Sequence, residues 1–406
     1  MKKALVLAGG FPQIALLKEL KSRGYVTVLA DWNKEPVAKA YADIFYQEST
    51  LDVEAITRVA REEKVDFLTT VCTDQALLTV AKVSETLGLP CYIDYKTALH
   101  VTNKAYMKKV FVESGIPTAK HVIVDDAAQV PDNMPFPLIV KPVDCNSSKG
   151  VKRVENREEL AEAVKMAVGY SRTHTAVVEQ FVSGPELSVD VYVQDGTAHV
   201  LCVSNNDKIA AEDKFIIFRG RCPAAEAEPV KHKIQEAAQR IADAFHLRNT
   251  PMLIQLIVEK GEIYILEFSA RTGGGTKFLR IRHLTGFDVV GAVVDLTEGE
   301  KPRLEISEKK QYLADEFLYC KPGRFDRLDG FEELKNQGVI ADFYVFKWRG
   351  AEFDQVESSG DRVAGFTIVA DTYEELQKKH RTVAGTVRVL DMDGNDMLRH
   401  DLLTDL

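Results

Sequence analysis

The sequence predicts a multidomain protein of the α/β and α+β classes, with a doubly wound parallel sheet at its N-terminus. The chain has 406 residues, whereas single hydrophobic cores stop growing at roughly 250–300 residues. Strand-like and helical patterns alternate along the first quarter of the chain, which favours a parallel sheet. Further on, strand-like segments are joined by short turns that contain glycine, which is typical of antiparallel hairpins.

In the first quarter, strands are predicted for the short apolar runs, and helices for the segments with apolar residues at helical spacing. The predicted strands are 4–9, 26–31, 66–72 and 91–93. The predicted helices are 11–24, 52–63 and 74–88. Gly9 and Gly10 follow the first strand, and Asp31 ends the second. The glycine spacing of a dinucleotide site is missing, so an oxidoreductase is only a distant alternative.

The middle and the end of the chain mix helices with hairpins. Helices are predicted for 97–115, 157–171, 231–247 and 372–385. Strands are predicted for 137–142, 176–182, 186–196, 198–204, for two strands within 252–271, and for 363–371. Turns at Asp195-Gly196 and at Lys260-Gly261-Glu262 connect two of the strand pairs. From about residue 311 onward, the pattern is mixed α and β.

Composition narrows the class of function. Hydrophobic residues make up 45% and charged residues 28% of the chain, and the net charge is -9. An acidic chain without a basic block is a poor candidate for binding nucleic acid or an anionic membrane. The six cysteines are scattered without a C-x-x-C pair, which argues against structural zinc. We expect a soluble, cytoplasmic protein, since no segment is long enough to span a bilayer.

Several basic residues are candidates for binding phosphate. The chain lacks the G-x-x-x-x-G-K-[ST] loop and the protein-kinase motifs. It offers Lys104, Lys141 and Lys214, with the loop Ser147-Ser148-Lys149-Gly150. Lys141 interrupts an apolar strand, where an ammonium group needs a partner. A nucleotide phosphate would be such a partner, and a structural salt bridge is the commoner alternative.

One predicted hairpin carries polar groups on one face. Gln255 and Glu267 lie on strands joined by a tight turn, so they can face each other across the pair. Ser269 and Arg271 share the face of Glu267, because side chains alternate along a strand. Mg²⁺ prefers oxygen ligands and often bridges to phosphates through one or two carboxylates. A metal–phosphate site and a solvated hairpin face are both compatible with this pattern.

The order of these motifs resembles the ATP-grasp superfamily. The motifs are Lys104, Lys141, the small-residue loop, Glu179-Gln180-Phe181-Val182, Glu186, Gln255 and Glu267-Phe268-Ser269-Ala270-Arg271. The resemblance covers roughly residues 1–300 and is greatest to the branch with carbamoyl-phosphate synthetase, biotin carboxylase, glycinamide-ribonucleotide-forming ligases and bacterial L-amino acid ligases. It implies an ATP-grasp fold with an N-terminal domain (1–97), an ATP-grasp region (98–310, lid about 118–185) and a C-terminal α+β region (311–406).

The resemblance also implies roles for individual residues. Lys104, Lys141 and Lys214 would hold ATP phosphates, and the loop with Ser147, Ser148, Lys149 and Gly150 would close over them. Glu179, Gln180, Phe181 and Val182 would form the adenine hinge, and Glu186 would bind the ribose. Gln255, Glu267 and Ser269 would bind Mg²⁺, or Mn²⁺ in its place. Ser269 stands where the family usually has asparagine, which puts a second metal in doubt.

Substrate groups are expected beyond the hairpin. Arg271 would stabilise an acyl phosphate, together with Gly274 and Gly275 of a glycine loop that resembles the substrate-anion loop of this branch. Arg280, Arg282 and His283 could pair with a substrate carboxylate, and a solvated helix face is an equally good reading. The piece Ser359-Gly360-Asp361-Arg362-Val363-Ala364-Gly365 resembles the C-terminal region of L-amino acid ligases.

The resemblance implies an ATP-dependent, ADP-forming ligase that joins a small carboxylate to an amine through an acyl phosphate. Two alternatives stay open: an enzyme that activates bicarbonate, and a nucleotide-binding module without catalysis, which the serine at position 269 encourages. Relatives in this branch are often dimers, so a homodimer is an open alternative to a monomer.

Overall fold

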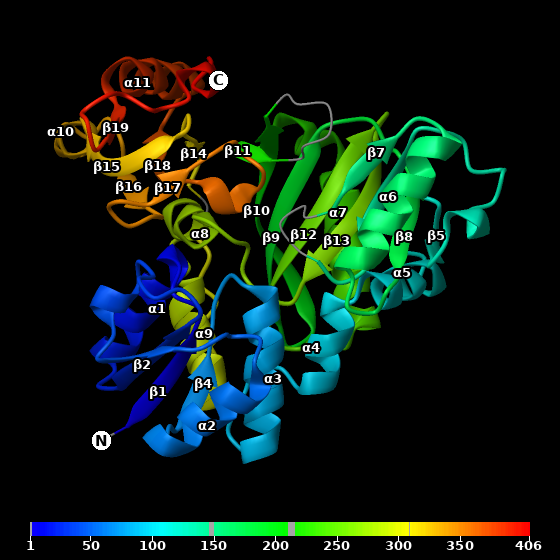
Figure 1. Ribbon diagram of the computed structural model, residues 1–406, viewed down its shortest axis with the longest axis horizontal. Helices are drawn as coiled ribbons and strands as arrows, with labels where there is room; N and C mark the ends of the chain where they lie inside the picture. The colour runs from blue at the N-terminus through cyan, green and yellow to red at the C-terminus, as the bar shows by residue number, and fades with distance from the viewer. Residues whose placement is uncertain (1, 146–149, 210–215, 308) are drawn as a thin grey trace.

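A computed structural model describes residues 2–145, 150–209, 216–307 and 309–406 (Figure 1). The N-terminal unit lies beneath a large central sheet, a small sheet with its helix flanks one end of that sheet, and the C-terminal elements lie at the other end. No helix in the described part of the chain is long and apolar enough to cross a membrane. The arrangement agrees with the predicted mixture of α/β and α+β units.

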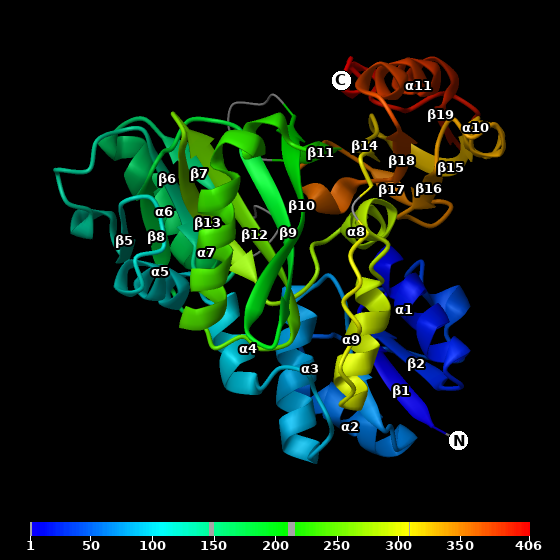
Figure 2. The same cartoon turned by 180° about the vertical axis from the view of Figure 1, so that it is seen from behind.

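The N-terminal unit is a parallel sheet with the strand order β3-β2-β1-β4. Its strands are β1 (Lys3–Leu7), β2 (Val26–Asp31), β3 (Ile44–Gln47) and β4 (Phe67–Thr69). Its helices are α1 (Phe11–Ser22), α2 (Val53–Glu63), α3 (Asp74–Leu87) and, from much later in the chain, α9 (Val289–Glu298). Ala4 and Val6 pack toward α1 and α9, whereas Leu5 and Leu7 pack toward α2 and α3. Figure 2 shows α9 on the face that α1 also covers, so the sheet is doubly wound as predicted.

The central sheet is antiparallel and has the strand order β13-β12-β9-β10-β11-β14-β18-β16. Its strands are β9 (Glu186–Gln194), β10 (Thr197–Lys208), β11 (Ile217–Cys222), β12 (Thr250–Glu259), β13 (Glu262–Ser269), β14 (Tyr312–Leu318), β16 (Asp342–Val345) and β18 (Ala364–Ala370). Asp195-Gly196 and Lys260-Gly261 have positive φ in both turn residues, which is the backbone conformation of tight hairpin turns. α7 (Lys231–Ala244) packs on one face with its apolar side.

The small sheet has the order β5-β8-β6-β7 and a core of its own beneath α6 (Arg157–Tyr170). Its strands are β5 (His121–Val124), β6 (Leu138–Pro142), β7 (Lys152–Val154) and β8 (Ala176–Gln180). In chain order these elements fall within the segment predicted as a lid. The lid and domain boundaries themselves stay predictions.

The C-terminal elements extend the central sheet and add a second layer. β14, β18 and β16 continue its hydrogen bonding, so the main-chain ladder runs across the predicted boundary at 311. The added elements are β15 (Gly323–Asp329), β17 (Glu352–Phe353), β19 (Arg388–Asp391), α10 (Phe331–Asn336) and α11 (Tyr373–Thr386). Short 3-10 turns lie at Lys39–Tyr41, Ala127–Gln129, Ala225–Val230, Ser359–Asp361 and His400–Leu402.

Two predicted elements differ from the structure. The helix expected over 97–115 is divided into α4 (Tyr95–Thr102) and α5 (Lys104–Glu113). Asn103 separates them with extended backbone angles, and its side-chain oxygen accepts a hydrogen bond from Tyr106 N at 2.9 Å. Asparagine is a strong N-cap, so it starts a new helix there. The segment 91–93 forms no strand.

Candidate functional site

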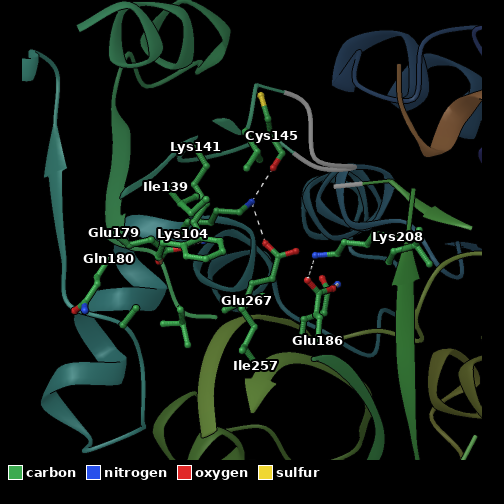
Figure 3. A pocket seen from close by; sticks show the side chains of 17 residues that line it. Lys104, Ile139, Lys141, Cys145, Glu179, Gln180, Glu186, Lys208, Ile257 and Glu267 are labelled. Carbon is green, nitrogen blue, oxygen red and sulfur yellow. Dashed lines mark hydrogen bonds and ion pairs between the residues drawn. The ribbon is translucent and has the colours of Figure 1, made fainter. Parts of the chain in front are cut away.

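A cavity opens between the small sheet and the central sheet, and many of the predicted site residues line it (Figure 3). The predicted residues that line it are Lys104, Lys141, Glu179, Gln180, Phe181, Val182, Glu186, Gln255 and Glu267. They come from α5, both sheets and the connection after β8. The folded chain therefore gathers two lysines and three carboxylates in one place from residues up to 163 positions apart in sequence (267 minus 104).

Lys104 lies at the start of α5 and links the two sides of the cavity. Its ammonium donates to the carbonyl oxygen of Cys145 at 2.7 Å and lies 3.3 Å from Oε2 of Glu267 (Figure 3). The lysine is only 8% exposed, and the Glu267 side chain is 37% exposed. A mostly desolvated cation beside a more accessible carboxylate is suited to a ligand that carries negative charge and a metal ion together.

Lys141 shares one buried carboxylate with a second lysine. Lys141 is ion-paired with Oε1 of Glu179, and Lys108 lies 2.9 Å from Oε2 of the same group. Burial favours the neutral acid, but the two ammonium groups outweigh it and hold the pKa of Glu179 well below its usual range. Burial lowers the pKa of Lys108 to about 8, against the opposing effect of Glu179. The salt-bridge alternative for Lys141 is therefore present, and the lysine still lines the cavity.

Glu186 forms a second charged cluster at the opposite side of the cavity. Its Oε2 lies 2.5 Å from the ammonium of Lys208 (Figure 3). Its Oε1 accepts from Asn206 at 3.0 Å and from Gln255 at 3.2 Å. Asn206 also donates to the Ser188 hydroxyl at 2.9 Å. These contacts fix the orientation of a carboxylate that can accept from both hydroxyls of a diol.

Gln255 and Glu267 are direct cross-strand partners in the β12–β13 hairpin, as predicted. The amide nitrogen of Gln255 donates to Glu186, which leaves its carbonyl oxygen available as a ligand. One carboxylate and one amide oxygen form a hard donor set that fits Mg²⁺ completed by phosphate oxygens. The third predicted metal ligand, Ser269, instead hydrogen-bonds to Asp74 through its hydroxyl.

Arg271 is held by a carboxylate from the N-terminal unit. Its Nε donates to Oδ1 of Asp74 at 2.7 Å, its Nη2 is paired with Oδ2, and its Nη1 donates to Thr272 O at 2.8 Å. Burial favours the neutral acid, yet Arg271 keeps the pKa of Asp74 below its usual range. The bidentate pair fixes the plane of the guanidinium.

The glycine loop follows directly. A Cβ at Gly273 would stand 2.2 Å from the Lys277 side chain. Gly275 has a φ of +72°, and a Cβ there would stand 3.0 Å from the Phe317 ring. A Cβ at Gly274 would stand 3.7 Å from the carbonyl oxygen of Cys72, in the connection between β4 and α3. The loop therefore lies where the N-terminal unit, the central sheet and the C-terminal elements meet.

The predicted residues Arg280, Arg282 and His283 each contact a different carboxylate of the protein. These residues lie on α8 (Lys277–Thr285). Arg280 is 1% exposed and its Nε and Nη2 donate to Asp315 at 2.9 and 2.6 Å. Arg282 is exposed and paired with Asp288, and His283 lies 3.5 Å from Asp342. The helix turns these side chains in different directions, so the structure argues against the expected substrate-carboxylate cluster.

Some predicted residues lie outside the described part of the chain: Ser147, Ser148, Lys149 and Lys214. Gly150 is described and has a φ of +74°. A Cβ there would stand 2.8 Å from Tyr170 and 2.9 Å from Pro142, so the position requires glycine. Its predicted role toward phosphate stays a prediction.

The sequence reasoning missed two charged residues: Lys208, which lines the cavity, and Lys108, which is buried and pairs with the cavity residue Glu179. Lys208 lies on β10 opposite the Glu186 end of β9, but the β9–β10 register shifts between Val200 and Cys202. Counting outward from the Asp195-Gly196 turn without this shift would therefore put Lys208 on the opposite face of the sheet from Glu186. Lys108 follows Lys104 by four residues, one helical turn, and that spacing was an available signal for a second buried lysine.

The dinucleotide alternative finds no support at Asp31. Its Oδ2 accepts from Gly9 N at 2.6 Å and its Oδ1 from Asn33 N at 2.7 Å. A Cβ at Gly9 would stand 2.5 Å from Pro36. The carboxylate is therefore used to close its own turn instead of facing a ligand.

Two family descriptions match the chain. "ATP-grasp domain" matches residues 134–278, which contain β6, β7 and β8 of the small sheet and the cavity strands β9, β12 and β13. "L-amino acid ligase C-terminal domain 2" matches residues 316–390. The second match falls on the region where the piece from Ser359 to Gly365 resembles those ligases.

Similar proteins include several ligases. The chain is 25% identical to the phosphoribosylamine–glycine ligase of Streptomyces coelicolor, over 94% of this chain and 95% of that one. It is 28% identical to the D-alanine–D-alanine ligase of Syntrophobacter fumaroxidans, over 48% of this chain and 66% of that one. The crystal structure of an L-amino acid ligase from Bacillus licheniformis matches with a TM-score of 0.80 and 21% identity, covering 97% of this chain and 99% of that one. The structural likeness supports the fold.

Proposed function

Because the chain belongs to the ATP-grasp superfamily of ligases, we propose that it is an ATP- and Mg²⁺-dependent ligase that joins a small carboxylate to an amine. The carboxylate is activated as an acyl phosphate, and ADP and phosphate are released. Within the superfamily, we place the chain nearest the L-amino acid ligases, which the match over 316–390 supports.

The observation that carries this proposal is the convergence of Lys104, Lys141, Glu186 and Glu267 on one cavity. A triphosphate needs cations around its oxygens, and a ribose needs an acceptor for its hydroxyls. In the proposal, Lys104 and Lys141 contact phosphates, the backbone of 179–182 reads the adenine edge, and Glu186 accepts from the ribose. Lys208, 2.5 Å from Glu186, adds a cation on the ribose and phosphate side.

The proposed metal ligands lie on the β12–β13 hairpin. Glu267 and Gln255 would hold Mg²⁺, or Mn²⁺, with phosphate oxygens completing the set, and Ser269 would contribute through its network with Asp74. When bound, the ion neutralises charge on the transferred phosphoryl group. A single carboxylate with a glutamine is enough for this task, since such sites share their metal with the substrate.

The reaction then proceeds beside Arg271 and the glycine loop. A substrate carboxylate oxygen attacks the γ-phosphorus, the bond to ADP breaks, and an acyl phosphate forms. Arg271, fixed by Asp74, and the backbone at Gly274 and Gly275 stabilise the developing negative charge. The amine nitrogen attacks the acyl carbon, a C–N bond forms, the C–O bond to phosphate breaks, and the amine loses a proton.

The proposed domains are consecutive segments of the chain. Residues 1–97 would form the N-terminal domain, 98–310 the ATP-grasp region and 311–406 the C-terminal region. The segment of about 118–185 would act as the lid over the nucleotide, which limits hydrolysis of the acyl phosphate by excluding water.

A phosphate-release assay tests the proposal. The full chain is given ATP and Mg²⁺ with pairs of amino acids and other carboxylic acids, and ADP, phosphate and the condensed product are measured together. We expect ADP release that depends on both a carboxylate and an amine. Release stimulated by bicarbonate alone would indicate a carboxylase instead, and nucleotide binding without ADP release would leave only a binding module.

A further inference from the structure

An arginine from the C-terminal region is held rigidly beside the glycine loop. The guanidinium carbon of Arg362 lies 3.7 Å from the centre of the Phe317 ring. Its Nε donates to the Tyr319 hydroxyl at 3.1 Å, and its Nη2 donates to the Ile217 carbonyl at 3.0 Å. Stacking and two hydrogen bonds from the Nε–Nη2 edge fix both the plane and the direction of the group.

The charge of Arg362 has no counter-ion among the described residues. Its hydrogen bonds there go to Tyr319, Ile217 and Ser359, none of which is a carboxylate. The adjacent Asp361 is engaged elsewhere, since its Oδ2 accepts from the backbone N–H groups of Glu357 and Ser358 at 2.8 Å each. A partly buried cation without a counter-ion costs free energy, which a bound anion would offset.

The remaining nitrogen of this guanidinium lies against the loop. Nη1 is 3.6 Å from the position that a Cβ would take at Gly275. α8 begins two residues later, and its N-cap, Thr276, makes no side-chain capping hydrogen bond. In the described structure, the buried hydroxyls of Thr272 and Thr276 also have no hydrogen-bond partner. The N–H groups at the start of a helix and a guanidinium without a counter-ion, beside one another at Gly275, together offer donors for an anion.

This donor set adjoins the nucleotide cavity and differs from the Arg271 site. Ile217, which accepts from Arg362, also lines the cavity that contains Lys104 and Glu267. Arg271, before the loop, is already paired with Asp74. The loop therefore has a neutralised arginine on its N-terminal side and an unpaired one beside Gly275.

We propose that Arg362 binds the carboxylate of the amine-supplying substrate, so that this substrate is an amino acid whose own carboxylate stays free. The inference rests on the proposed ligase function and extends it to the second substrate. The C-terminal region then supplies specificity for the acceptor, while the central sheet supplies the nucleotide site. Arg362 contacts substrate in this proposal and takes no part in phosphoryl transfer.

The test compares acceptors with and without a carboxylate. The full chain, with ATP, Mg²⁺ and the acyl donor found in the phosphate-release assay, is given proteinogenic amino acids or their α-carboxamides as amines. A charge-assisted hydrogen bond contributes about 1.5–3 kcal/mol, so we expect wild-type kcat/KM to favour the acid by about ten- to a hundredfold. In Arg362→Gln the acid-to-amide ratio falls to near one through KM of the acceptor, with KM for ATP changed less than about twofold.

Two further variants make the result specific. Arg362→Lys keeps a cation and should restore part of the preference for the acid. Arg381→Gln, at an exposed arginine on α11, should keep the wild-type ratio. An unchanged ratio in Arg362→Gln, with ADP still formed, overturns this inference alone. Equal use of acid and amide by the wild type also overturns it, even where Arg362→Gln fails to fold. Absence of ADP with every pair refutes the ligase function and this inference together.

Discussion

The cavity residues and α8 use charge in opposite ways. In the cavity, charged side chains from strands and from the start of α5 face a common space, and their pairs span different elements, as Lys104 with Glu267 does. On α8, the most buried cation is Arg280, and it forms an ion pair with Asp315 in the core. Strand alternation reveals which residues share a face, whereas a charged helix does not reveal which of its sides a neighbouring unit will bury. Charged residues that face the cavity are available to a ligand, whereas the buried Arg280–Asp315 pair joins two parts of the structure.

Of the changes considered, Glu267→Ala in the cavity is expected to have the largest effect, which is on enzymatic activity. The change removes the carboxylate proposed to hold the metal, and a bound metal contributes several kcal/mol to transition-state stabilisation. We expect ADP formation to fall more than about 100-fold, with the far-ultraviolet circular dichroism unchanged. Glu262→Ala is the matched control, because this exposed glutamate of the same hairpin pairs with Lys233 outside the cavity. Full Mg²⁺-dependent activity in Glu267→Ala would remove the metal assignment.

Arg280→Met is expected to unfold the protein more readily instead of altering the chemistry. It leaves the fully buried Asp315 without its cation, which costs about 3–5 kcal/mol. Urea denaturation should show this loss in the free energy of unfolding. Arg282→Met, at an exposed arginine two residues away, should change it by no more than about 1 kcal/mol. If Arg280→Met were as stable as the wild type yet lost affinity for a carboxylate substrate, the substrate role would have to be reinstated.

The fold was largely predictable because its signals are local. Alternating strands and helices indicated the doubly wound sheet, and the glycines at 196 and 261 indicated two hairpins of the central sheet. The division of the helix at Asn103 was missed, because helical periodicity continues on both sides and masks an N-cap. The addition of β14, β18 and β16 to the central sheet could not be read either, since strand pairing over such separations leaves no local pattern.

The site was predictable where residues sit in motifs and not where tertiary packing decides. The cross-strand pair of Gln255 and Glu267 followed from the turn between them. The partnership of Arg271 with Asp74 did not, because it joins residues 197 positions apart. Lys208 was hidden by a register shift, and the burial of Arg280 depends on Asp315 from the C-terminal part of the sheet.

Lys141→Ala is expected to weaken nucleotide binding by a smaller factor than the metal-site change. Losing a charge-assisted contact costs about 1.5–3 kcal/mol, or roughly ten- to a hundredfold in the dissociation constant of ADP. The control is Lys152→Ala, an exposed lysine on β7, the strand paired with β6. Isothermal titration with the non-hydrolysed product ADP separates phosphate contacts from chemistry. Unaltered titrations in Lys141→Ala would mean that this ammonium serves only to neutralise Glu179.

Asp342→Asn probes the smallest effect, at the contact between α8 and the C-terminal elements. Oδ2 of Asp342 lies 3.5 Å from His283, and Oδ1 accepts from Lys335 at 3.0 Å. His283, with Lys335, lowers the pKa of Asp342 although burial opposes the change. A carboxyl whose pKa is lower in the folded chain stabilises it above its unfolded pKa, and the effect is lost as pH falls through the folded value.

Because Asp342 and its partners are partly exposed, the variant should lose only about 0.2–1 kcal/mol of unfolding free energy at neutral pH. The difference from the wild type should shrink as the pH is lowered through the depressed pKa of this carboxyl, where both chains are neutral at position 342. Denaturation midpoints measured across acidic pH test this. A difference that grows toward acid would mean that the Asp342 carboxylate is not what stabilises the contact between α8 and β16.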